Sequence, residues 1–557
     1  MIRDRVTPQE QSCDLCIVGS GPVGMALALE LERLGREVVV LESGGSRVNA
    51  RLADASRADI ADTRRHAPME MAVCRALGGT SWTWGGRCVA FDDVDFEARS
   101  YVPDSGWSIR HEDIQPWYLQ AAGYLRCGND TFFSAPRFLP EMRDDISVSS
   151  LERWSSEPQL ALAHRDRMEQ SQSITVCLNS TVVDLELGER GGVVEGVVVR
   201  GPAGMARIKA GAVILAAGGI ETTRLLLAVQ RRWPQHFGGL NGPLGRYYMG
   251  HISGKIANIV LQQPEAIADL DFEKDATGTY VRRRFTVSAG AQERNEVFNT
   301  SFFPDNPPFH DARHRSSVLS AVFLALAAGP IGRRILPEAI RQAHVGSGAR
   351  HFGAHLRNVL LDGPRGALVM SEIVRDRFLS KPRKPGFLVR NREGRYALHY
   401  HAEQEPNPES RVALTNENDQ FGLPRVSIDL RFTDNDASSV VRSHEILDSA
   451  LRNSSVGRLE YWHPQEERVA RVLAQASDGF HQAGTTRMGT DPRNSVVDTD
   501  LKAHDVANLY VASSSVFPTT GQANSTFLAV ALAVRLAHHL QEKPAPDARE
   551  SDLHASR

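Results

Sequence analysis

The stretch FHQAGTTRMG, residues 480–489, contains a side chain that could move a proton. An unperturbed histidine has a pKa near ~6.5, so His481 suits a general base at neutral pH. Buried histidines are also common as packed polar side chains, and this stretch alone leaves both interpretations of His481 open. A base of this kind acts only if other elements bring a substrate and an acceptor beside it.

Residues 14–42 predict an element that binds a dinucleotide. The apolar run DLCIV is followed by GSGPVG at 19–24 and by a helical pattern, and a second apolar run, 38–41, ends at Glu42. Glycines let the backbone turn tightly beside a pyrophosphate, the helix start offers free N–H groups, and Glu42 can accept hydrogen bonds from a ribose diol. The complete βαβ unit predicts an adenine dinucleotide without separating NAD from FAD.

Later segments favour flavin and continue the same sheet. LGGTSWTWGG, residues 77–86, sets four glycines and small polar residues around two tryptophans, which suits a backbone wrapped around a flat ligand, although a glycine-rich surface turn has the same composition. Residues 174–187 predict one or two strands, and 212–228 predict a buried parallel strand followed by a helix. The sheet is therefore interrupted and resumed along the chain, which argues against a simple N-terminal cofactor domain.

The carboxy-terminal block carries a family resemblance. It contains DGFHQAGTTRMG from residue 478, VASSS at 511–515 and QANST at 522–526. Together with GSGPVG, LGGTSWTWGG, ILAAGGIETTRLLL, LGRYYMGH (244–251) and PNPESRVAL (406–414), the chain resembles the glucose-methanol-choline (GMC) family of FAD-dependent alcohol oxidoreductases, especially its branch of pyranose oxidase and the fructose and sorbitol dehydrogenases. The resemblance extends in order over nearly the full length.

The resemblance implies roles for particular residues. His481 corresponds to the family histidine that takes the substrate hydroxyl proton at the flavin, and Asn524 to a second catalytic position that the family fills with histidine or asparagine. The usual N-P-T becomes Asn524-Ser525-Thr526, without the proline. Some relatives tether FAD covalently through a histidine where this chain has Thr83, so the resemblance implies non-covalent FAD. Ser513 replaces the aspartate of the family's VADAS.

The chemistry of alcohol oxidation agrees with these roles. A hydride moves from the carbinol carbon to flavin N5 while the hydroxyl proton leaves, and a neutral imidazole such as His481 is a suitable acceptor. Asn524 cannot take a proton at neutral pH, but its amide can donate a hydrogen bond to the developing alkoxide. Residues 525–540 predict an apolar helix whose N-terminus would favour negative charge near flavin N1 and O2.

Each of these segments contributes residues to the predicted cofactor site. We expect FAD to contact Gly19, Gly21, Pro22, Val23, Gly24, Glu42, Ser43, Gly79, Thr80, Ser81, Trp84, Gly86, Val182, Ala217, Gly218, Ser514, Ser525 and Thr526.

The predicted fold class is α/β, a Rossmann-type FAD-binding domain that is discontinuous in sequence, with a mixed α+β substrate domain. The FAD-binding domain is expected at 1–130, 170–260 and 470–541, a connecting segment at 131–169, the substrate domain at 261–469, and a disordered tail at 542–557. The substrate domain shows strand-like pieces at 282–287, 387–389, 395–400, 411–414 and 425–430, and helical ones around 317–380 and 434–453.

The predicted function is the FAD-dependent oxidation of a CH–OH group of a sugar, glycoside or polyol, with His481 as base. A dehydrogenase is favoured over an oxidase by the resemblance alone, and the electron acceptor stays open between oxygen, a quinone and a protein carrier. The alternatives are a flavin-containing lyase of the hydroxynitrile lyase type, a sterol or aliphatic alcohol oxidase, and a non-catalytic flavoprotein, which would not need both His481 and Asn524.

Other histidines and one arginine are weaker candidates. His251 is expected to be structural, with a substrate role as the alternative. His399 and His401 share one face of a strand, as a metal pair would, but no third ligand is nearby in the sequence, so no metal is predicted. Arg487 could meet a phosphate or form a structural bond. Gln404 and His401 lie in the stretch where substrate contacts are first sought.

Composition argues against several other classes. With 64 basic and 67 acidic residues among 557, the net charge of −3 provides no basic field for nucleic acid. The basic clusters RHR (313–315) and KPRKP (381–385) are expected to be solvated loops. The N-terminus lacks a signal-peptide pattern. Six scattered cysteines favour a reducing compartment, and Cys13 and Cys16 would face opposite sides of a strand, so a cytoplasmic protein with structural cysteines is expected.

No transmembrane segment is predicted. The longest apolar stretch, 318–331, is shorter than the ~20 residues that a spanning helix needs and is broken by Gly329-Pro330. Arginines 313, 315, 333 and 334 flank it, so contact with a membrane surface is the alternative to a packed helix.

Overall fold

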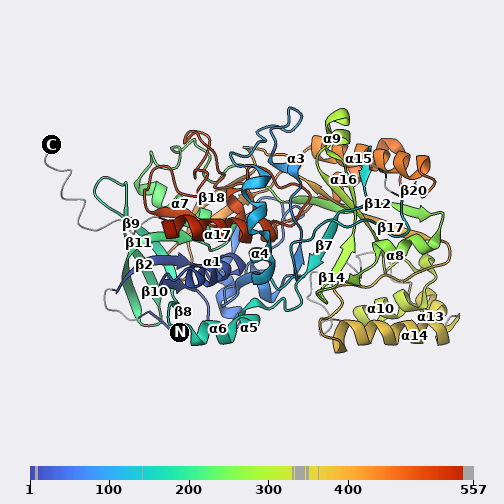
Figure 1. Cartoon of the computed structure of the whole chain (residues 1–557), viewed down its shortest axis with the longest axis horizontal. Coiled ribbons are helices and arrows are strands. Elements are labelled where there is room, and N and C mark those ends of the chain that lie inside the picture. Colours follow the sequence, from blue (N-terminus) through green and yellow to red (C-terminus); the bar gives the residue numbers. More distant parts are fainter. Residues whose placement is uncertain are drawn as a thin grey trace.

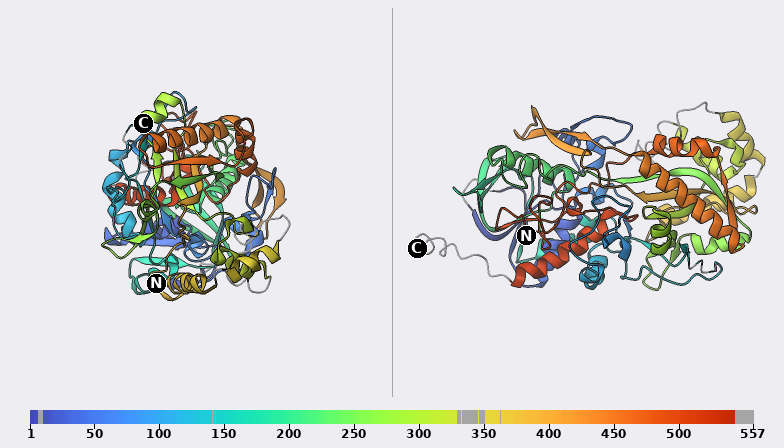
Figure 2. Two further views of the ribbon diagram at one scale, coloured as in Figure 1. Left: turned by 90° about the vertical axis from the view of Figure 1, so that its right-hand side faces the viewer. Right: turned by 90° about the horizontal axis from the view of Figure 1, so that it is seen from above.

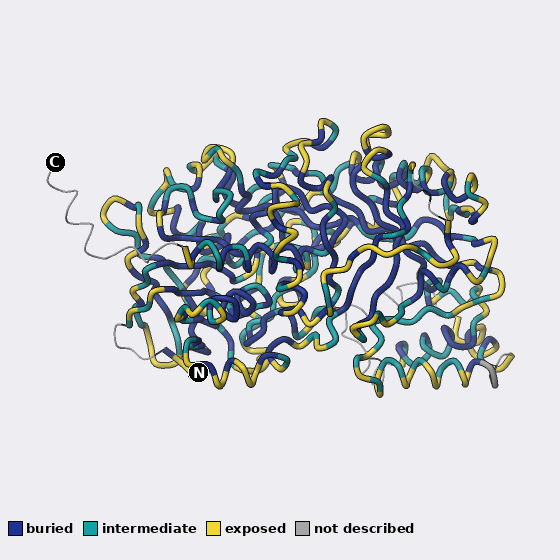
Figure 3. Tube along the Cα trace, in the orientation of Figure 1, coloured by how far each residue is buried: buried dark blue, intermediate teal, exposed yellow. Residues whose placement is uncertain are grey.

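The computed structural model describes residues 1–6, 11–140, 142, 144–328, 332, 345, 351–361 and 363–542. Two lobes lie side by side along the long axis of the molecule, one around α1 and α17 and the other around β12 and α15 (Figure 1). The view from above shows the same division (Figure 2). Buried chain runs through both lobes and through the region where they meet (Figure 3).

The first lobe is built on an eight-stranded sheet. Along the path β1-β8-β3-β2-β11-β10-β9, with β21 beside β11, the strands are β1 (Ile2–Arg3), β8 (Ile174–Cys177), β3 (Val38–Leu41), β2 (Gln11–Val18), β11 (Gly204–Leu215), β10 (Val194–Gly201), β9 (Thr181–Leu187) and β21 (Leu509–Val511). The pairs from β1 to β11 and the β11–β21 pair are parallel, and β10 and β9 are antiparallel. Runs of buried valine, isoleucine and leucine explain a sheet that is covered on both faces. The predicted interruption and resumption of the sheet is confirmed.

Helices cover this sheet where the sequence predicts them. The βαβ unit is β2, α1 (Pro22–Arg33) and β3, and β11 leads into α7 (Gly219–Arg232). The predicted carboxy-terminal helix is α17 (Ser525–Glu542), which packs on α1 and is buried along most of its length. Shorter helices of the chain are α2 (Met69–Ala72), α3 (Asp93–Phe96), α4 (Tyr118–Tyr124), α5 (Leu160–Ala163), α6 (Arg165–Gln170), α8 (Ile267–Leu270) and α9 (Ala289–Asn295).

The second lobe contains a six-stranded sheet with helices on it. In order, its strands are β20 (Gly457–Tyr461), β12 (His251–Leu261), β17 (Arg395–Glu403), β16 (Thr300–Asp305), β15 (Phe285–Val287) and β6 (Ile146–Ser147). α15 (Asp434–Asn453) and α16 (Arg468–Gln475) pack together over this sheet, where their apolar residues join one core with those of the strands. This mixture confirms the α+β character predicted for the segment.

Two smaller sheets complete the strands. The four-stranded sheet is β13 (Glu273–Lys274), β14 (Tyr280–Arg283), β7 (Leu151–Trp154) and β5 (Arg87–Cys88); the three-stranded sheet is β18 (Arg411–Asn418), β19 (Pro424–Asp429) and β4 (Ala58–Ile60). Both join distant parts of the chain. β6 and β7 come from the predicted connecting segment, and β12 comes from the range predicted for the FAD-binding domain although it pairs with β17 and β20.

One predicted strand is wrong. Residues 387–389 form no strand, because their backbone hydrogen bonds go to a side chain and not to a neighbouring strand. The Asn306 amide donates to the Phe387 carbonyl at 2.7 Å, and its oxygen accepts from the Val389 N–H at 2.9 Å. The predicted disordered tail lies outside the described residues apart from Glu542, which ends α17.

A layer of helices lies at the edge of the second lobe, below β14 in Figure 1. It consists of α10 (Ser317–Ala327), α13 (Phe352–Leu361), α14 (Gly363–Val374) and a π-helical turn, η7 (Arg375–Leu379). α10 contains the first ten residues of the apolar stretch 318–331 and buries Val318, Leu319 and Phe323, as expected for a packed helix. Residues 329–331 lie outside the described residues. Among the helices that the structure describes, none is long and apolar enough to cross a membrane.

Candidate active site

A long pocket opens at the carboxyl ends of the parallel strands of the first sheet. Its walls include the last residues of β2 and β3, the turn after β11, and the segment after β21. Ligands of doubly wound sheets bind at this edge, where loops diverge and helix N-termini point at the ligand.

The glycine turn after β2 is shaped for close approach of a ligand. Gly19 has φ +101°, and a Cβ there would lie 2.6 Å from the Ala216 carbonyl oxygen. A Cβ on Gly24 would lie 2.0 Å from the Gly19 carbonyl oxygen, so Gly24 allows α1 to pack on the turn. At Gly21, by contrast, no atom lies within 4 Å of the Cβ position. This open space beside the start of α1 fits a pyrophosphate.

Glu42 lines the pocket from the end of β3. Its carboxylate accepts hydrogen bonds from the Ser20 hydroxyl at 2.6 Å, the Ser20 N–H at 3.1 Å and the Gly44 N–H at 2.8 Å. Burial raises the pKa of Glu42 above its ordinary value, although these hydrogen bonds oppose the shift. The residue is thus fixed at the position where the βαβ unit predicts a ribose contact.

Most of the predicted cofactor residues line this pocket: Gly19, Gly21, Pro22, Val23, Glu42, Ser43, Gly79, Thr80, Val182, Ala217, Gly218, Ser514, Ser525 and Thr526. Gly24, Ser81, Trp84 and Gly86 do not line it. Ser81 donates to the Gly78 carbonyl at 2.6 Å and the Trp84 indole to the Pro158 carbonyl at 2.6 Å, so both side chains hold the glycine-rich loop in shape. A Cβ at Gly86 would lie 3.2 Å from Ser155.

The sequence interpretation missed Arg75, which also lines the pocket. Its guanidinium donates to the Ser43 hydroxyl at 2.9 Å and pairs with Glu221 at 2.8 Å. Burial raises the pKa of Glu221, but the neighbouring Arg75 and Arg224 outweigh it and hold this pKa below the usual value. A basic residue directly before a glycine-rich loop that wraps a dinucleotide was the available signal.

His481 and Asn524, 43 positions apart in the sequence, lie together at one end of the pocket. The neighbours of His481, Phe480 and Gln482, line the pocket, and so do the two residues after Asn524. The Asn524 Nδ2 lies 2.6 Å from His481 Nε2, and the Asn524 Oδ1 has no hydrogen-bond partner. The structure therefore brings together the two residues for which a catalytic role is predicted.

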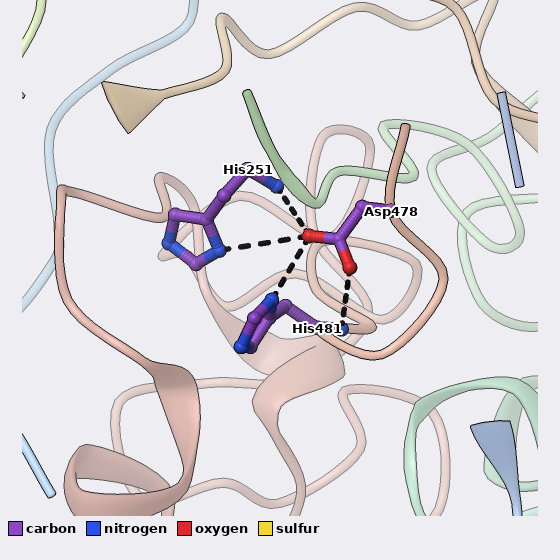
Figure 4. Close-up of side chains that lie close together, drawn as sticks. All are labelled: His251, Asp478 and His481. Atoms are coloured by element: carbon purple, nitrogen blue, oxygen red, sulfur yellow. Dashed lines mark hydrogen bonds and ion pairs between the residues drawn. The ribbon is translucent and has the colours of Figure 1, made fainter. Parts of the chain in front are cut away.

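Asp478 holds the other nitrogen of His481 and was missed by the sequence interpretation. Its Oδ2 lies 2.9 Å from His481 Nδ1, and its side chain is 5% exposed (Figure 4). Burial raises the pKa of Asp478, but His481 and His251 outweigh burial, so this pKa lies below the ordinary value. An ionised carboxylate accepts a hydrogen bond from Nδ1–H, which leaves the lone pair of His481 on Nε2, toward Asn524.

His251 shares the carboxylate of Asp478. Its N–H donates to Asp478 Oδ2 at 2.7 Å, its ring lies edge-on to His481 at 4.7 Å between centroids, and its Nδ1 is 3.8 Å from the same oxygen. Burial, together with the nearby His481, lowers the pKa of His251 to about 3. His401 stacks behind it at 4.3 Å. His251 was expected to be structural, with a substrate role as the alternative, and the structure places it against His481 and Asp478.

The remaining candidates form structural contacts. Arg487 donates to the Asp104 carbonyl at 2.7 Å and stacks on Tyr247. Of the two roles considered for Arg487, a phosphate contact and a structural bond, the structure shows the bond. Gln404 accepts from the Gly250 N–H at 2.8 Å and donates to the Arg431 carbonyl at 2.7 Å. His399 stacks on Phe303, away from the base.

Three side chains of the site, other than the pair His399 and His401 considered from the sequence, lie close enough together to hold a metal ion. One ligand atom from each of His251, Asp478 and His481 lies within 4.8 Å of the others. Two of these atoms, His481 Nδ1 and Asp478 Oδ2, already share a hydrogen bond, which suits proton transfer at Nε2. The prediction of no metal stays a prediction.

Comparison with known families agrees with this geometry. The family described as GMC oxidoreductase matches residues 406–533, which include β18, β19 and the loops of His481 and Asn524. The FAD binding domain family matches residues 12–72, which contain the glycine turn and Glu42. The fructose dehydrogenase large subunit of Gluconobacter japonicus is 21% identical over 94% of this chain and 97% of its own length. The carboxy-terminal segment of the chain is thus similar to GMC oxidoreductases, and its amino-terminal segment to FAD binding domains.

Other relatives of this chain align over shorter stretches. The C-glycoside 3-oxidase of Arthrobacter globiformis is 39% identical over 24% of this chain and 25% of its own length. The pyranose 2-oxidase of Tricholoma matsutake is 30% identical over 23% of this chain and 22% of its own length. Among solved structures, pyridoxine 4-oxidase from Mesorbium loti has a TM-score of 0.50 at 15% identity and covers 96% of this chain and all of its own, which supports the fold.

FAD is the cofactor of this chain. The open position at Gly21, the buried carboxylate of Glu42 and the place of the pocket at the ends of the parallel strands fit an adenine dinucleotide. The flavin end of the ligand would then lie toward His481, because residues on both sides of His481 line the pocket.

A substitution at Glu42 tests this placement. Glu42→Gln is expected to weaken FAD binding about tenfold or more, because it replaces a charged acceptor at the ribose position with a neutral one. FAD release on dilution, followed by flavin fluorescence, measures this affinity. Glu37→Gln, an exposed position at the opposite end of β3, serves as the control. Equal FAD affinity of both variants would place the ribose elsewhere.

Proposed function

We propose that this chain oxidises a CH–OH group of a small alcohol to a carbonyl, with His481 as the base. The contacts of His481 carry this proposal. Its Nε2 lies beside Asn524, its Nδ1 is hydrogen-bonded to the buried Asp478, and the residues on both sides of it line the FAD pocket. A base, a hydrogen-bond donor and a cofactor pocket in one place are what this reaction requires.

The side chains divide the work of the reaction. When bound, FAD supplies the acceptor for the hydride that leaves the carbinol carbon. His481 Nε2 accepts the hydroxyl proton, and Asp478 stabilises the imidazolium that results. The Asn524 amide donates a hydrogen bond to the oxygen as negative charge develops there. The free N–H groups at the start of α17 lie beside the pocket and favour negative charge on the ring system.

We propose a sugar, glycoside or polyol as substrate. The names of the relatives support this class, since they include a fructose dehydrogenase, a C-glycoside 3-oxidase and a pyranose 2-oxidase. A dehydrogenase is the preferred form, because the fructose dehydrogenase subunit matches over nearly the whole chain. The electron acceptor and the cytoplasmic location stay predictions.

FAD is proposed to bind without a covalent bond. Thr83, at the position where some relatives carry a tethering histidine, is exposed and its hydroxyl donates to the Thr80 carbonyl at 3.3 Å. A threonine hydroxyl is not a nucleophile of the required strength. Precipitation of the yellow protein with acid is therefore expected to release all of its flavin into the supernatant. Flavin that stays in the washed pellet would contradict the proposal.

A donor and acceptor matrix tests the proposed function. The holoprotein is supplied with sugars, glycosides, polyols, aliphatic alcohols, a sterol and a cyanohydrin, each with oxygen, a soluble quinone or a redox dye. We expect turnover with a carbohydrate or polyol, faster with the quinone or dye than with oxygen. Turnover of the sterol or aliphatic alcohols alone would overturn the substrate class, and cyanide release without acceptor reduction would overturn the oxidation itself.

A further inference from the structure

The helical layer of the second lobe carries an unusual amount of exposed apolar surface. Of the twenty large apolar residues that are exposed in the described part of the chain, eight lie within residues 352–379. We call them the apolar set: Phe352, Leu356, Leu360, Leu361, Leu368, Val374, Phe378 and Leu379. Leu360, Leu361 and Leu379 are 82%, 74% and 74% exposed. Single exposed apolar residues are ordinary, but a concentration of this kind marks a surface that something covers.

α13 is built with its polar side inward. Its buried residues are His355 and Asn358, which lie against Ser320 of α10 at 3.1 Å each. Leu356 and Leu360 are four residues apart and exposed, so they share the face that points away from α10, whereas Phe352 at the start of α13 lies near Phe323 of α10, with 6.0 Å between ring centroids. In a water-soluble helix the apolar stripe faces the core. The opposite arrangement in α13 indicates that its outer face meets an apolar medium.

α14 continues the same outer side. Gly366 faces α10, since a Cβ there would lie 2.2 Å from the Ser317 hydroxyl. Leu368 and Val374 are exposed, and η7 adds Phe378 and Leu379. Figure 1 shows α14 along the lower margin of the molecule, and Figure 3 shows exposed chain along that margin. The surface is therefore a protruding helical edge and not a groove.

The same segment is strongly basic. Residues 313–384 contain 13 Lys and Arg and 4 Asp and Glu, a net charge of +9, whereas the chain as a whole has −3, so all other residues together have −12. Arg313, Arg315, Arg357, Lys381 and Arg383 are exposed around the apolar set. The two basic clusters that sequence alone suggested were solvated loops thus flank one apolar surface.

We propose that this helical layer docks on the surface of an anionic lipid bilayer. Exposed Leu and Phe side chains would enter the boundary between headgroups and acyl chains while the surrounding Lys and Arg meet the anionic headgroups. A protruding edge rich in leucine suits lipid, since protein interfaces favour Trp, Tyr and Arg in complementary pockets. A second copy of the chain would bring +9 against +9, which opposes self-association through this surface. The count of +9 already includes the four arginines and one glutamate of residues 333–350.

For the apolar stretch 318–331 a packed helix was expected, with contact with a membrane surface as the alternative, and α10 buries apolar residues against α13 and α14. The segment that faces outward is the next one along the chain. The docking surface is far from the FAD pocket in the chain and does not depend on the proposed reaction.

Vesicle sedimentation of the full-length holoprotein tests the proposal. We expect binding to phosphatidylglycerol–phosphatidylcholine vesicles, no binding to phosphatidylcholine alone, and loss of binding at high salt, because the basic side chains supply the attraction. The double variant Leu360→Gln/Leu361→Gln is expected to bind at least about tenfold more weakly, since two leucines no longer enter the lipid. Leu240→Gln, 70% exposed and placed between α7 and β12, is the matched control and should bind like the parent.

Several outcomes would overturn the proposal. Absence of binding to anionic vesicles would do so, as would equal binding by the double variant. Concentration-dependent self-association that the double variant abolishes would assign the surface to a second copy. Binding to polyglutamate but not to vesicles would assign it to an acidic protein. Because the changed leucines are exposed, the double variant should keep its flavin spectrum and melting temperature, which verifies that it folds.

Discussion

His481→Gln is expected to slow flavin reduction by the alcohol substrate by about two to four orders of magnitude, which is the usual contribution of a general base. Glutamine can still bond to Asp478 and Asn524, but it cannot accept the hydroxyl proton. FAD should stay bound, because Phe480 and Gln482 line the pocket and His481 itself does not. Anaerobic stopped-flow absorbance of the oxidised flavin measures the rate.

The control for this variant is the same substitution at another histidine. His463→Gln changes a half-buried histidine in the loop after β20, outside the pocket, and should reduce its flavin at the parental rate. If His481→Gln also reduced its flavin at that rate, the assignment of His481 as base would be wrong. A slow rate accompanied by loss of FAD would indicate a structural role for His481.

Asp478→Asn is expected to have the second-largest effect, a loss of roughly a hundredfold or more in the rate of flavin reduction. The new amide can donate to Nδ1 of His481, which moves the ring proton to Nε2 and blocks the position that must accept the substrate proton. The imidazolium also loses the neighbouring negative charge. We therefore expect slower flavin reduction in the variant than in the parent near neutral pH, as measured by anaerobic stopped-flow absorbance of the oxidised flavin.

A stability measurement separates this role from packing. The pKa of Asp478 is lower in the folded protein than its unfolded value of about 3.9, so its ionised form stabilises the fold above that pH and this contribution is lost as pH falls through the folded value. The free energy of unfolding of the parent should exceed that of Asp478→Asn near neutral pH, and the difference should shrink in acid. Asp478→Glu should recover part of the rate. Flavin reduction in Asp478→Asn at the parental rate would contradict the role assigned to Asp478.

Local patterns were sufficient to predict the cofactor-binding half of the fold. The glycine turn, the apolar strands and Glu42 lie within about 30 residues of one another, so their arrangement follows from one βαβ unit and needs no long-range contact. α15 and α17 were also predicted, because capping and apolar periodicity are local properties. His481 and Asn524 required the family resemblance, since 43 residues separate them in the sequence.

The rest of the site depends on contacts that no local pattern encodes. His251 reaches His481 because Met249 pairs with Ala483 and the His251 N–H binds Asp478. Asp478 itself could have been found from its spacing, since a carboxylate three residues before a catalytic histidine can reach Nδ1. Ser81 and Trp84 were placed on the ligand because small and aromatic residues suit it, but their hydrogen bonds point into the loop. The sequence did not predict that the apolar face of α13 points outward, because apolar periodicity alone does not say which side of a helix is buried.

The most direct test of the account is a single anaerobic turnover of the holoprotein with its best alcohol substrate and no electron acceptor. The account predicts that the absorbance of oxidised flavin disappears and that the carbonyl product forms in an amount equal to the flavin bleached, quickly in the parent and about two to four orders of magnitude more slowly in His481→Gln. Oxidised flavin that persists while a substrate is cleaved, or bleaching at equal rates in both proteins, would contradict it.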